Sequence, residues 1–176
     1  LVAEVFDEDT LRHLPGRDPA RLVQMSNHSP GAGAADSSNS GVPDFYDRLR
    51  ETTVYEEQAL FNTGSVRLDE DGGPVRGGVM DVTPSFLRVM RTAPALGRAF
   101  TNEEGEPGNE KKVLLSDGLW RSLFAADPGA VGKDLRLDGQ PYTVVGVMPR
   151  SFEALAPGVS LWRPTAFTAE EKSDER

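Results

Sequence analysis

The segment Arg136–Pro149, with the sequence RLDGQPYTVVGVMP, constrains the fold of this chain more than any other segment. Apolar and polar residues alternate on both sides of Asp138-Gly139, which is typical of strands with one buried face. An Asp-Gly pair between two such runs predicts a β-hairpin with a tight turn. Pro149 has no N–H to donate and should end the second strand. No residue pattern here suits moving a proton or holding a metal or phosphate, so we interpret the segment as a rigid hairpin rather than an active-site floor.

The same period of two predicts strands elsewhere in the chain. We expect strands at 21–27, 57–62, 65–69, 74–82 and 111–116, and an edge strand at 160–164. The second and third of these should flank a turn at Thr63-Gly64. Glu70–Gly73 (EDGG) predicts a hairpin turn, because its glycines can adopt positive φ. Gly77-Gly78 indicates a bulge or a close backbone approach.

Three short helices are expected. Residues 43–51 combine a proline in the first turn with apolar residues four apart. Residues 83–90 should be capped by Thr83 and have Pro84 at the first helical position. Residues 117–124 should be capped by Ser116, with Leu119, Trp120, Leu123 and Phe124 turned inward. Between these helices, 91–100 should run as an extended loop and 101–110 as an acidic surface loop.

Mixed short strands and short helices without regular βαβ alternation predict an α+β fold. The 18 glycines and 13 prolines indicate an ordered but loop-rich chain. Residues 28–41 are small and polar, and we expect a flexible loop there. The net charge of −9 and the absence of a basic stripe argue against nucleic acid as a partner. With no cysteine, disulfides, zinc–thiolate sites and cysteine nucleophiles are excluded.

Several short patterns suggest chemistry but fail on inspection. His13 and His28 are the only histidines, and neither accompanies a strained nucleophile motif. Asp69 and Asp71 alternate as in a calcium loop, but the remaining ligand positions do not fit and a hairpin turn explains them better. Residues 129–134 (GAVGKD) lack both the first glycine and the Ser or Thr of a phosphate loop.

Two side-chain groups need a structure to be judged. Glu103, Glu104, Glu106 and Glu110 lie close in sequence, but paired carboxylates serve glycoside hydrolysis only in a cleft. The aromatic residues Trp120, Phe124, Tyr142 and Trp162 could form a ligand-binding patch, although their spacing fits core positions better. Arg98 and Arg121 are expected to pair with acidic residues at the surface. The sequence therefore predicts no catalytic, cofactor-binding or metal-binding residue.

The order of several phrases resembles a known family. They are LPGRDPARLV at 14–23, DFYDRLRETTVYEEQAL at 44–60, SFLRVMRTAPALGRAFTNEEGEPG at 85–108, the long block from VLLSDGLWRSLF to VVGVMPRSF at 113–152, and LWRP at 161–164. Together they resemble the MacB-like periplasmic core domain of ABC-transporter permeases of the MacB/FtsX type. The block at 113–152 is the most specific.

The resemblance implies a porter-like α/β layer joined to a mainly β insertion subdomain with short strands and two to three short helices. Residues 1–62 would hold an initial segment and the porter-like strand–helix–strand portion, residues 63–164 the insertion subdomain, and residues 165–176 a polar tail. Family members place this domain between two transmembrane helices, so the chain would be an excised segment. The family domain usually continues into a final helix–strand unit beyond a point matching Arg176.

The resemblance also implies a function without chemistry. The domain would lie on the extracytoplasmic (periplasmic) face of the membrane and relay motion driven by ATP hydrolysis in a separate cytoplasmic ATPase. It would contact a substrate, a periplasmic adaptor protein or a homodimer mate. Two alternatives stay open: a free-standing secreted binding or adhesion module, and a hydrolase built on acidic residues.

Overall fold

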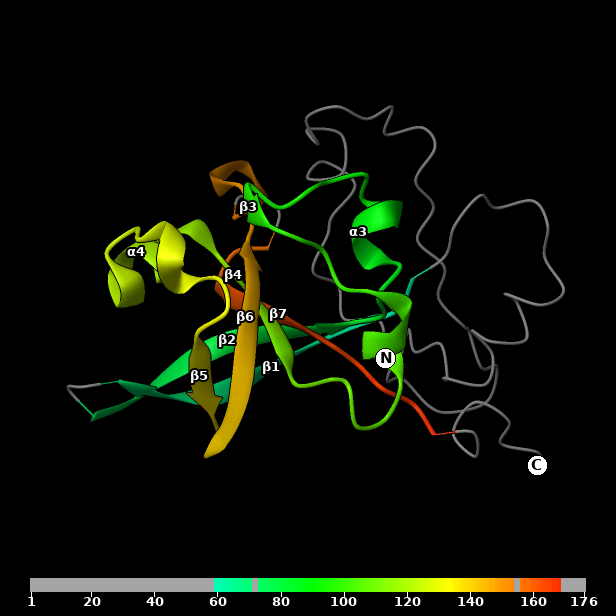
Figure 1. Ribbon diagram of the computed structural model, residues 1–176, viewed down its shortest axis with the longest axis horizontal. Helices are drawn as coiled ribbons and strands as arrows, with labels where there is room; N and C mark the ends of the chain where they lie inside the picture. The colour runs from blue at the N-terminus through cyan, green and yellow to red at the C-terminus, as the bar shows by residue number, and fades with distance from the viewer. Residues whose placement is uncertain (1–58, 71–72, 154–155, 169–176) are drawn as a thin grey trace, which may run out of the picture.

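The computed structural model describes residues 59–70, 73–153 and 156–168 of the chain. The predicted strand at 21–27, the loop at 28–41, the helix at 43–51, and both histidines lie outside the described residues. In the described part, seven strands form one mixed sheet that a few short helices accompany, which is an α+β fold (Figure 1).

The strands are β1 (Phe61–Glu70), β2 (Gly73–Val82), β3 (Leu96–Gly97), β4 (Lys112–Leu115), β5 (Asp134–Leu137), β6 (Gln140–Val147) and β7 (Val159–Pro164). The α-helices are α3 (Phe86–Val89) and α4 (Asp117–Phe124). Three 3₁₀ turns complete the set: η2 (Asn102–Gly105), η3 (Pro128–Ala130) and η4 (Arg150–Phe152).

The sheet curls until it nearly closes on itself. Its strand order is β3-β6-β4-β7-β2-β1-β5, and β5 pairs with β6 as well as with β1. Six strands therefore form a ring, β6-β4-β7-β2-β1-β5, and β3 pairs with the far end of β6. The contact between β1 and β5 is the weak point of the ring, because only Leu68 and Leu137 are paired across it.

Alternation along the strands sorts the apolar side chains into two cores. The inner core, enclosed by the ring, contains Val66, Leu68, Val79, Val113, Leu115, Leu135, Leu137, Val144, Val147 and Leu161. The outer core lies on the other face of the same strands and contains Met80, Val82, Phe86, Leu87, Met90, Phe100, Leu114, Val145, Met148, Phe152, Ala156 and Trp162. Neighbouring strand residues contribute to opposite cores, as the period of two requires.

The predicted hairpin at Asp138-Gly139 is confirmed. Leu137 pairs with Gln140, which leaves a two-residue turn. Asp138 has φ of 50° and Gly139 has φ of 79°, as a type I′ turn requires. The hairpin after Glu70 is also confirmed, since Glu70 pairs with Gly73. Asp69, which belonged to the calcium-like pattern, lies in β1. Its carboxylate oxygen forms an ion pair with Nε of Arg67 at 3.6 Å.

The expectation of a bulge or a close backbone approach at Gly77-Gly78 is confirmed at Gly78. The pairing of β2 with β7 shifts register between Gly78 and Val79, which is a bulge or irregularity. A Cβ atom on Gly78 would lie 2.0 Å from the carbonyl oxygen of Gly158, so the backbones approach closely there.

Several sequence-based expectations about secondary structure are wrong. No turn occurs at Thr63-Gly64, because β1 pairs with β2 at every residue from Phe61 to Glu70. Thr83 does not cap a helix and Pro84 is not a first helical residue. Instead, α3 follows Ser85, and the Thr83 hydroxyl accepts the N–H of Leu60 at 3.0 Å.

The segment at 160–164 is not an edge strand. It lies in β7 between β4 and β2, with Leu161 and Trp162 fully buried. The loop at 91–100 is not wholly irregular either, because Leu96 and Gly97 pair with β6 as β3.

The predicted Ser116 cap of α4 is confirmed, because its hydroxyl accepts the N–H of Leu119 at 3.1 Å. The helix ends at Phe124, as expected. Ala125 takes a left-handed conformation with φ of 50° as the C-cap, and Ala126 follows at 59°.

Candidate functional site

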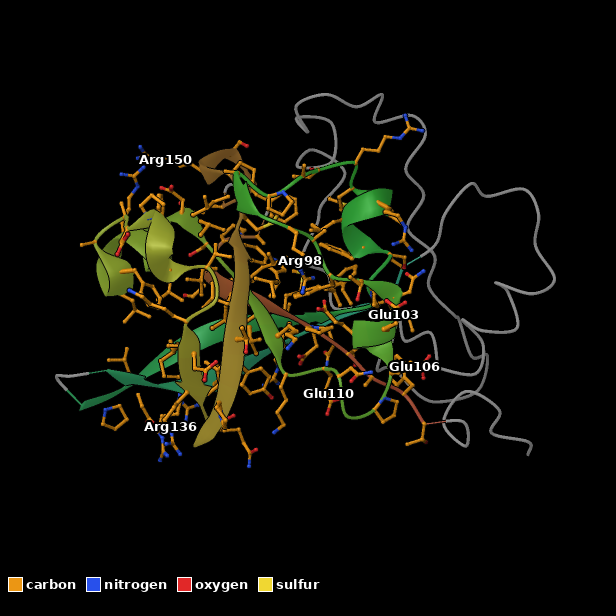
Figure 2. All side chains as sticks on the ribbon, viewed as in Figure 1. Arg98, Glu103, Glu106, Glu110, Arg136 and Arg150 are labelled. Carbon is orange, nitrogen blue, oxygen red and sulfur yellow. The ribbon has the colours of Figure 1, made fainter. Side chains whose placement is uncertain are left out.

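The acidic loop at 101–110 turns one of its four glutamates inward. Glu104 is turned inward and is 6% exposed. Its carboxylate accepts hydrogen bonds from Arg98 at 2.6 and 3.2 Å and from the Thr101 N–H at 3.0 Å. Glu103 and Glu106, labelled in Figure 2, are exposed. Glu104 therefore anchors the loop to Arg98 and Thr101. Among the described residues, no group of three or more acidic or histidine side chains is arranged to hold a metal ion.

Both arginines expected to pair with acids do so. The hydrogen bond and charge of Glu104 raise the pKa of Arg98 despite partial burial. Arg121 contacts Asp117 at 2.7 Å, one helical turn earlier, and this bond raises its pKa. Each arginine therefore stays charged and fixes local geometry.

The four aromatic residues of the possible ligand patch do not form one patch. Trp162 belongs to the outer core and packs edge-on against Phe152 with ring centroids 5.4 Å apart. Trp120, Phe124 and Tyr142 instead pack, partly buried, against the inner core. The interpretation as core residues is therefore the correct one for Trp162, and the other three cover the inner core at the surface.

One end of the ring carries a half-buried ion pair that the sequence did not reveal. Arg163 in β7 contacts Asp81 in β2 at 2.5 and 3.3 Å, and the two side chains are 22% and 25% exposed. Burial lowers the pKa of Arg163, but the hydrogen bond and charge of Asp81 outweigh it and raise the pKa overall. Asp81 and Arg163 are 82 positions apart, so only the parallel pairing of β2 with β7 reveals them.

The aromatic ring of Tyr142 lies close to two cations at this end of the ring of strands. The guanidinium of Arg163 lies 5.8 Å from the Tyr142 ring centroid, and the Lys111 ammonium lies 5.6 Å from it. Lys111 also donates to Gln140. By the alternation of their strands, Asp81 and Arg163 lie on the inner side of the sheet, beyond the apolar inner core. At this end of the ring, the inner side of the sheet is therefore covered by an ion pair and an aromatic ring between two cations. Among the described residues, the network places no nucleophile or general base in a cleft.

A shallow hollow of about 420 Å³ lies where α4 begins. It is lined by Ser116, Gly118, Leu119, Ser122, Glu153, Ala156, Gly158, Val159 and Ser160. The Glu153 carboxylate accepts the N–H of Gly118 at 2.6 Å, so the exposed donors at the start of the helix are already engaged. Its described lining residues supply serine hydroxyls and one carboxylate, with no histidine or lysine among them.

No helix within 59–70, 73–153 and 156–168 has the length and apolar character needed to cross a membrane.

Comparison with known proteins places the chain in a family. The profile of the MacB-like periplasmic core domain matches residues 5–175. No curated protein sequence matches the chain. Among solved structures, the periplasmic region of MacB from Actinobacillus actinomycetemcomitans aligns with a TM-score of 0.59 at 14% identity, over 85% of this chain and 64% of that one.

A second structure has a similar fold. It is the extracellular domain of the noncanonic ABC-type transporter YknZ from Gram-positive bacteria, with a TM-score of 0.55, 17% identity, and coverage of 69% of this chain and 60% of that chain. The chain thus spans less than two thirds of the length of either structure. Because the family profile covers nearly every residue, this chain belongs to the MacB-like periplasmic core domain family, found in ABC-transporter permeases.

Proposed function

We propose that this chain is the extracytoplasmic domain of an ABC-transporter permease that relays motion driven by ATP hydrolysis and contacts a substrate or a partner protein. The family match carries the proposal. ATP is hydrolysed by a separate cytoplasmic ATPase, and the partner on the outer side is a periplasmic adaptor protein or a homodimer mate. The chain uses no cofactor of its own and binds no nucleic acid.

The architecture supports a mechanical role. A relay must transmit displacement without deforming, and a nearly closed ring of strands packed on both faces resists deformation. The inner core, the outer core and the Asp81–Arg163 pair hold neighbouring strands together. The ion pairs Arg98–Glu104, Arg121–Asp117 and Arg163–Asp81 add further fixed contacts, which supports a role based on rigidity.

We further propose the division implied by the resemblance, with a porter-like α/β layer in about residues 1–62 and an insertion subdomain in 63–164. Because β1 runs from Phe61 to Glu70 across residue 62, we propose that the junction falls just before this strand rather than within it. Limited proteolysis tests the division. We expect the first cuts to fall before Phe61 and a protected fragment to begin near it; cuts within β1 would contradict it.

The location can be tested with a single thiol. The chain has no cysteine, and Val75 near the tip of the β1–β2 hairpin is 46% exposed. Val75→Cys in the full-length parent protein should react with a membrane-impermeant maleimide in intact cells or spheroplasts. Leu161→Cys, at a fully buried position, is the matched control and should not react. Reaction of Val75→Cys only after lysis would refute the extracytoplasmic location.

Membrane fractionation and the sequence of the full-length gene separate the runner-up, a free-standing secreted module. A permease domain should remain in the membrane fraction and carry hydrophobic helices on both sides of it in the full-length gene. A secreted module should appear in the soluble extracytoplasmic fraction, preceded by a secretion signal. An adjacent gene encoding an ATPase with a phosphate-binding loop would favour the permease.

A further inference from the structure

Within the part of the chain that the structure describes, the first half of β1 has an open edge on the side away from β2. The N–H of Arg67 donates to the Asp138 carboxylate and the N–H of Asp138 donates to the Arg67 carbonyl, both at 2.9 Å. The backbone groups of Arg67 therefore face away from β2. Because these directions alternate along an antiparallel strand, and the register with β2 is unbroken, the N–H and C=O of Thr63 and Ser65 face the same way.

No other strand of the described part covers this edge. β5 pairs with β1 only through Leu68 and Leu137. Because the strands are antiparallel and Leu137 is the last residue of β5, the rest of β5 lies on the Glu70 side of this contact. Figure 1 shows β5 beside one part of β1, while the part toward Phe61 extends away from it. Within the described residues, the outward backbone groups of Thr63 and Ser65 have no hydrogen-bond partner.

The edge also lacks the usual protection against pairing. Edge strands normally carry a charged residue, a proline or a bulge that discourages another strand. Residues 62–65 read Asn-Thr-Gly-Ser, with no charge and no proline, and their pairing with β2 has no register shift. Ser65 is exposed and Thr63 is half-buried, so their backbone is accessible to another strand.

We propose that this edge pairs with the same edge of a second copy of the chain, antiparallel, with the two-fold axis at Gly64. In this register, Thr63 of each copy lies opposite Ser65 of the other, and the four outward N–H groups meet four carbonyls. The segment complements itself, as a two-fold interface requires. Hydroxyl residues opposite one another are favourable cross-strand pairs, and no like charges meet.

Gly64 explains why the axis lies there. Gly64 would face Gly64 of the second copy in a non-hydrogen-bonded pair, where strands approach to about 4.5 Å between Cα atoms and side chains crowd most. The pairing ends at Arg67, because its backbone groups are already bonded to Asp138. The two β1 strands would then join the ring of one copy to the ring of the other in one continuous sheet.

The contact should be weak and sensitive to salt. Four backbone hydrogen bonds form a much smaller interface than the roughly 1,000 Å² of a stable complex. Two copies, each with a net charge of −9, also repel one another at low ionic strength. Dimerisation should therefore require near-millimolar protein and should strengthen as salt is added.

Charged residues placed at Thr63 and Ser65 test the register. Two double variants are needed. One carries Thr63→Lys and Ser65→Lys, and the other carries Thr63→Glu and Ser65→Glu. In a dimer of either variant, like charges face each other twice across the two-fold axis. By analytical ultracentrifugation, each double variant alone should dimerise at least ~10-fold more weakly than the unchanged chain. An equimolar mixture of the two should recover dimers, because the charges are then opposite.

A third variant distinguishes this register from others. Thr63→Lys with Ser65→Glu complements itself only if residue 63 faces residue 65, so it should dimerise alone at least as well as the unchanged chain. Amide exchange at Thr63 and Ser65 should slow as protein concentration rises, while that of Val66, bonded to β2, should not. A monomer at every concentration, unaltered dimers in both like-charge variants, or protection of both amides at high dilution would each overturn the proposal.

Discussion

The Asp138 side chain should make a measurable contribution to closing the ring. It combines two roles that substitutions can separate. Its backbone is left-handed, with φ of 50°, and its carboxylate accepts the N–H of Arg67 at 2.9 Å across the contact between β1 and β5. The only paired residues there are Leu68 and Leu137, so this bond supports the least paired part of the ring.

Three substitutions give a predicted order. Asp138→Asn keeps an oxygen acceptor and tolerates the left-handed region, so it should cost about 0.5 kcal/mol or less. Asp138→Gly tolerates the turn but removes the acceptor, which should cost about 1 kcal/mol for an exposed hydrogen bond. Asp138→Ala removes the acceptor and adds roughly 1–2 kcal/mol of backbone strain, for a total of about 2–3 kcal/mol.

Urea unfolding followed by tryptophan fluorescence and circular dichroism measures these differences. Hydrogen exchange adds a local measurement: the Arg67 amide should exchange faster in Asp138→Gly and Asp138→Ala but not in Asp138→Asn. Equal stabilities for the Gly and Ala variants would refute the turn argument. An unchanged Arg67 amide in Asp138→Gly would refute the proposed bond between the strands.

Three further substitutions, two of them with a matched control, should change the free energy of unfolding, measured the same way. Leu68→Ala in the inner core, 2% exposed, should destabilise by about 2–5 kcal/mol, whereas Val75→Ala at the exposed hairpin should cost little. Gly78→Ala should cost roughly 1–3 kcal/mol because its Cβ would overlap backbone, whereas Gly64→Ala meets its nearest atom at 3.8 Å and should cost less. Ala125→Gly should stabilise by about 0.5–1 kcal/mol by relieving the left-handed C-cap of α4. Results of the opposite sign, or equal costs for Gly78→Ala and Gly64→Ala, would contradict these arguments.

Local chemistry in the sequence was sufficient for some elements. Asp138-Gly139 specified its turn, because few residue pairs accept two positive φ values in succession. Ser116 specified the start of α4 because its hydroxyl can satisfy a backbone N–H that the helix leaves free. Strand alternation likewise identified the β5–β6 hairpin before any tertiary contact was known.

Longer-range features were not accessible in this way. Thr63-Gly64 resembles a turn locally, but pairing along the whole length of β2 keeps the chain extended there. Thr83 resembles a helix cap, but its hydroxyl binds Leu60 instead. In both cases a partner distant in sequence outweighed a weak local preference.

The sequence by itself determined the turns, the α4 cap, the strand periodicity and, through its ordered phrases, the family. The tertiary structure alone decided that β7 is central, that β5 bridges β1 and β6, and that Asp81 meets Arg163. The physical reason is that a turn or cap is satisfied within a few residues. A strand's neighbours are instead chosen by burial of both faces of the sheet, to which the whole chain contributes.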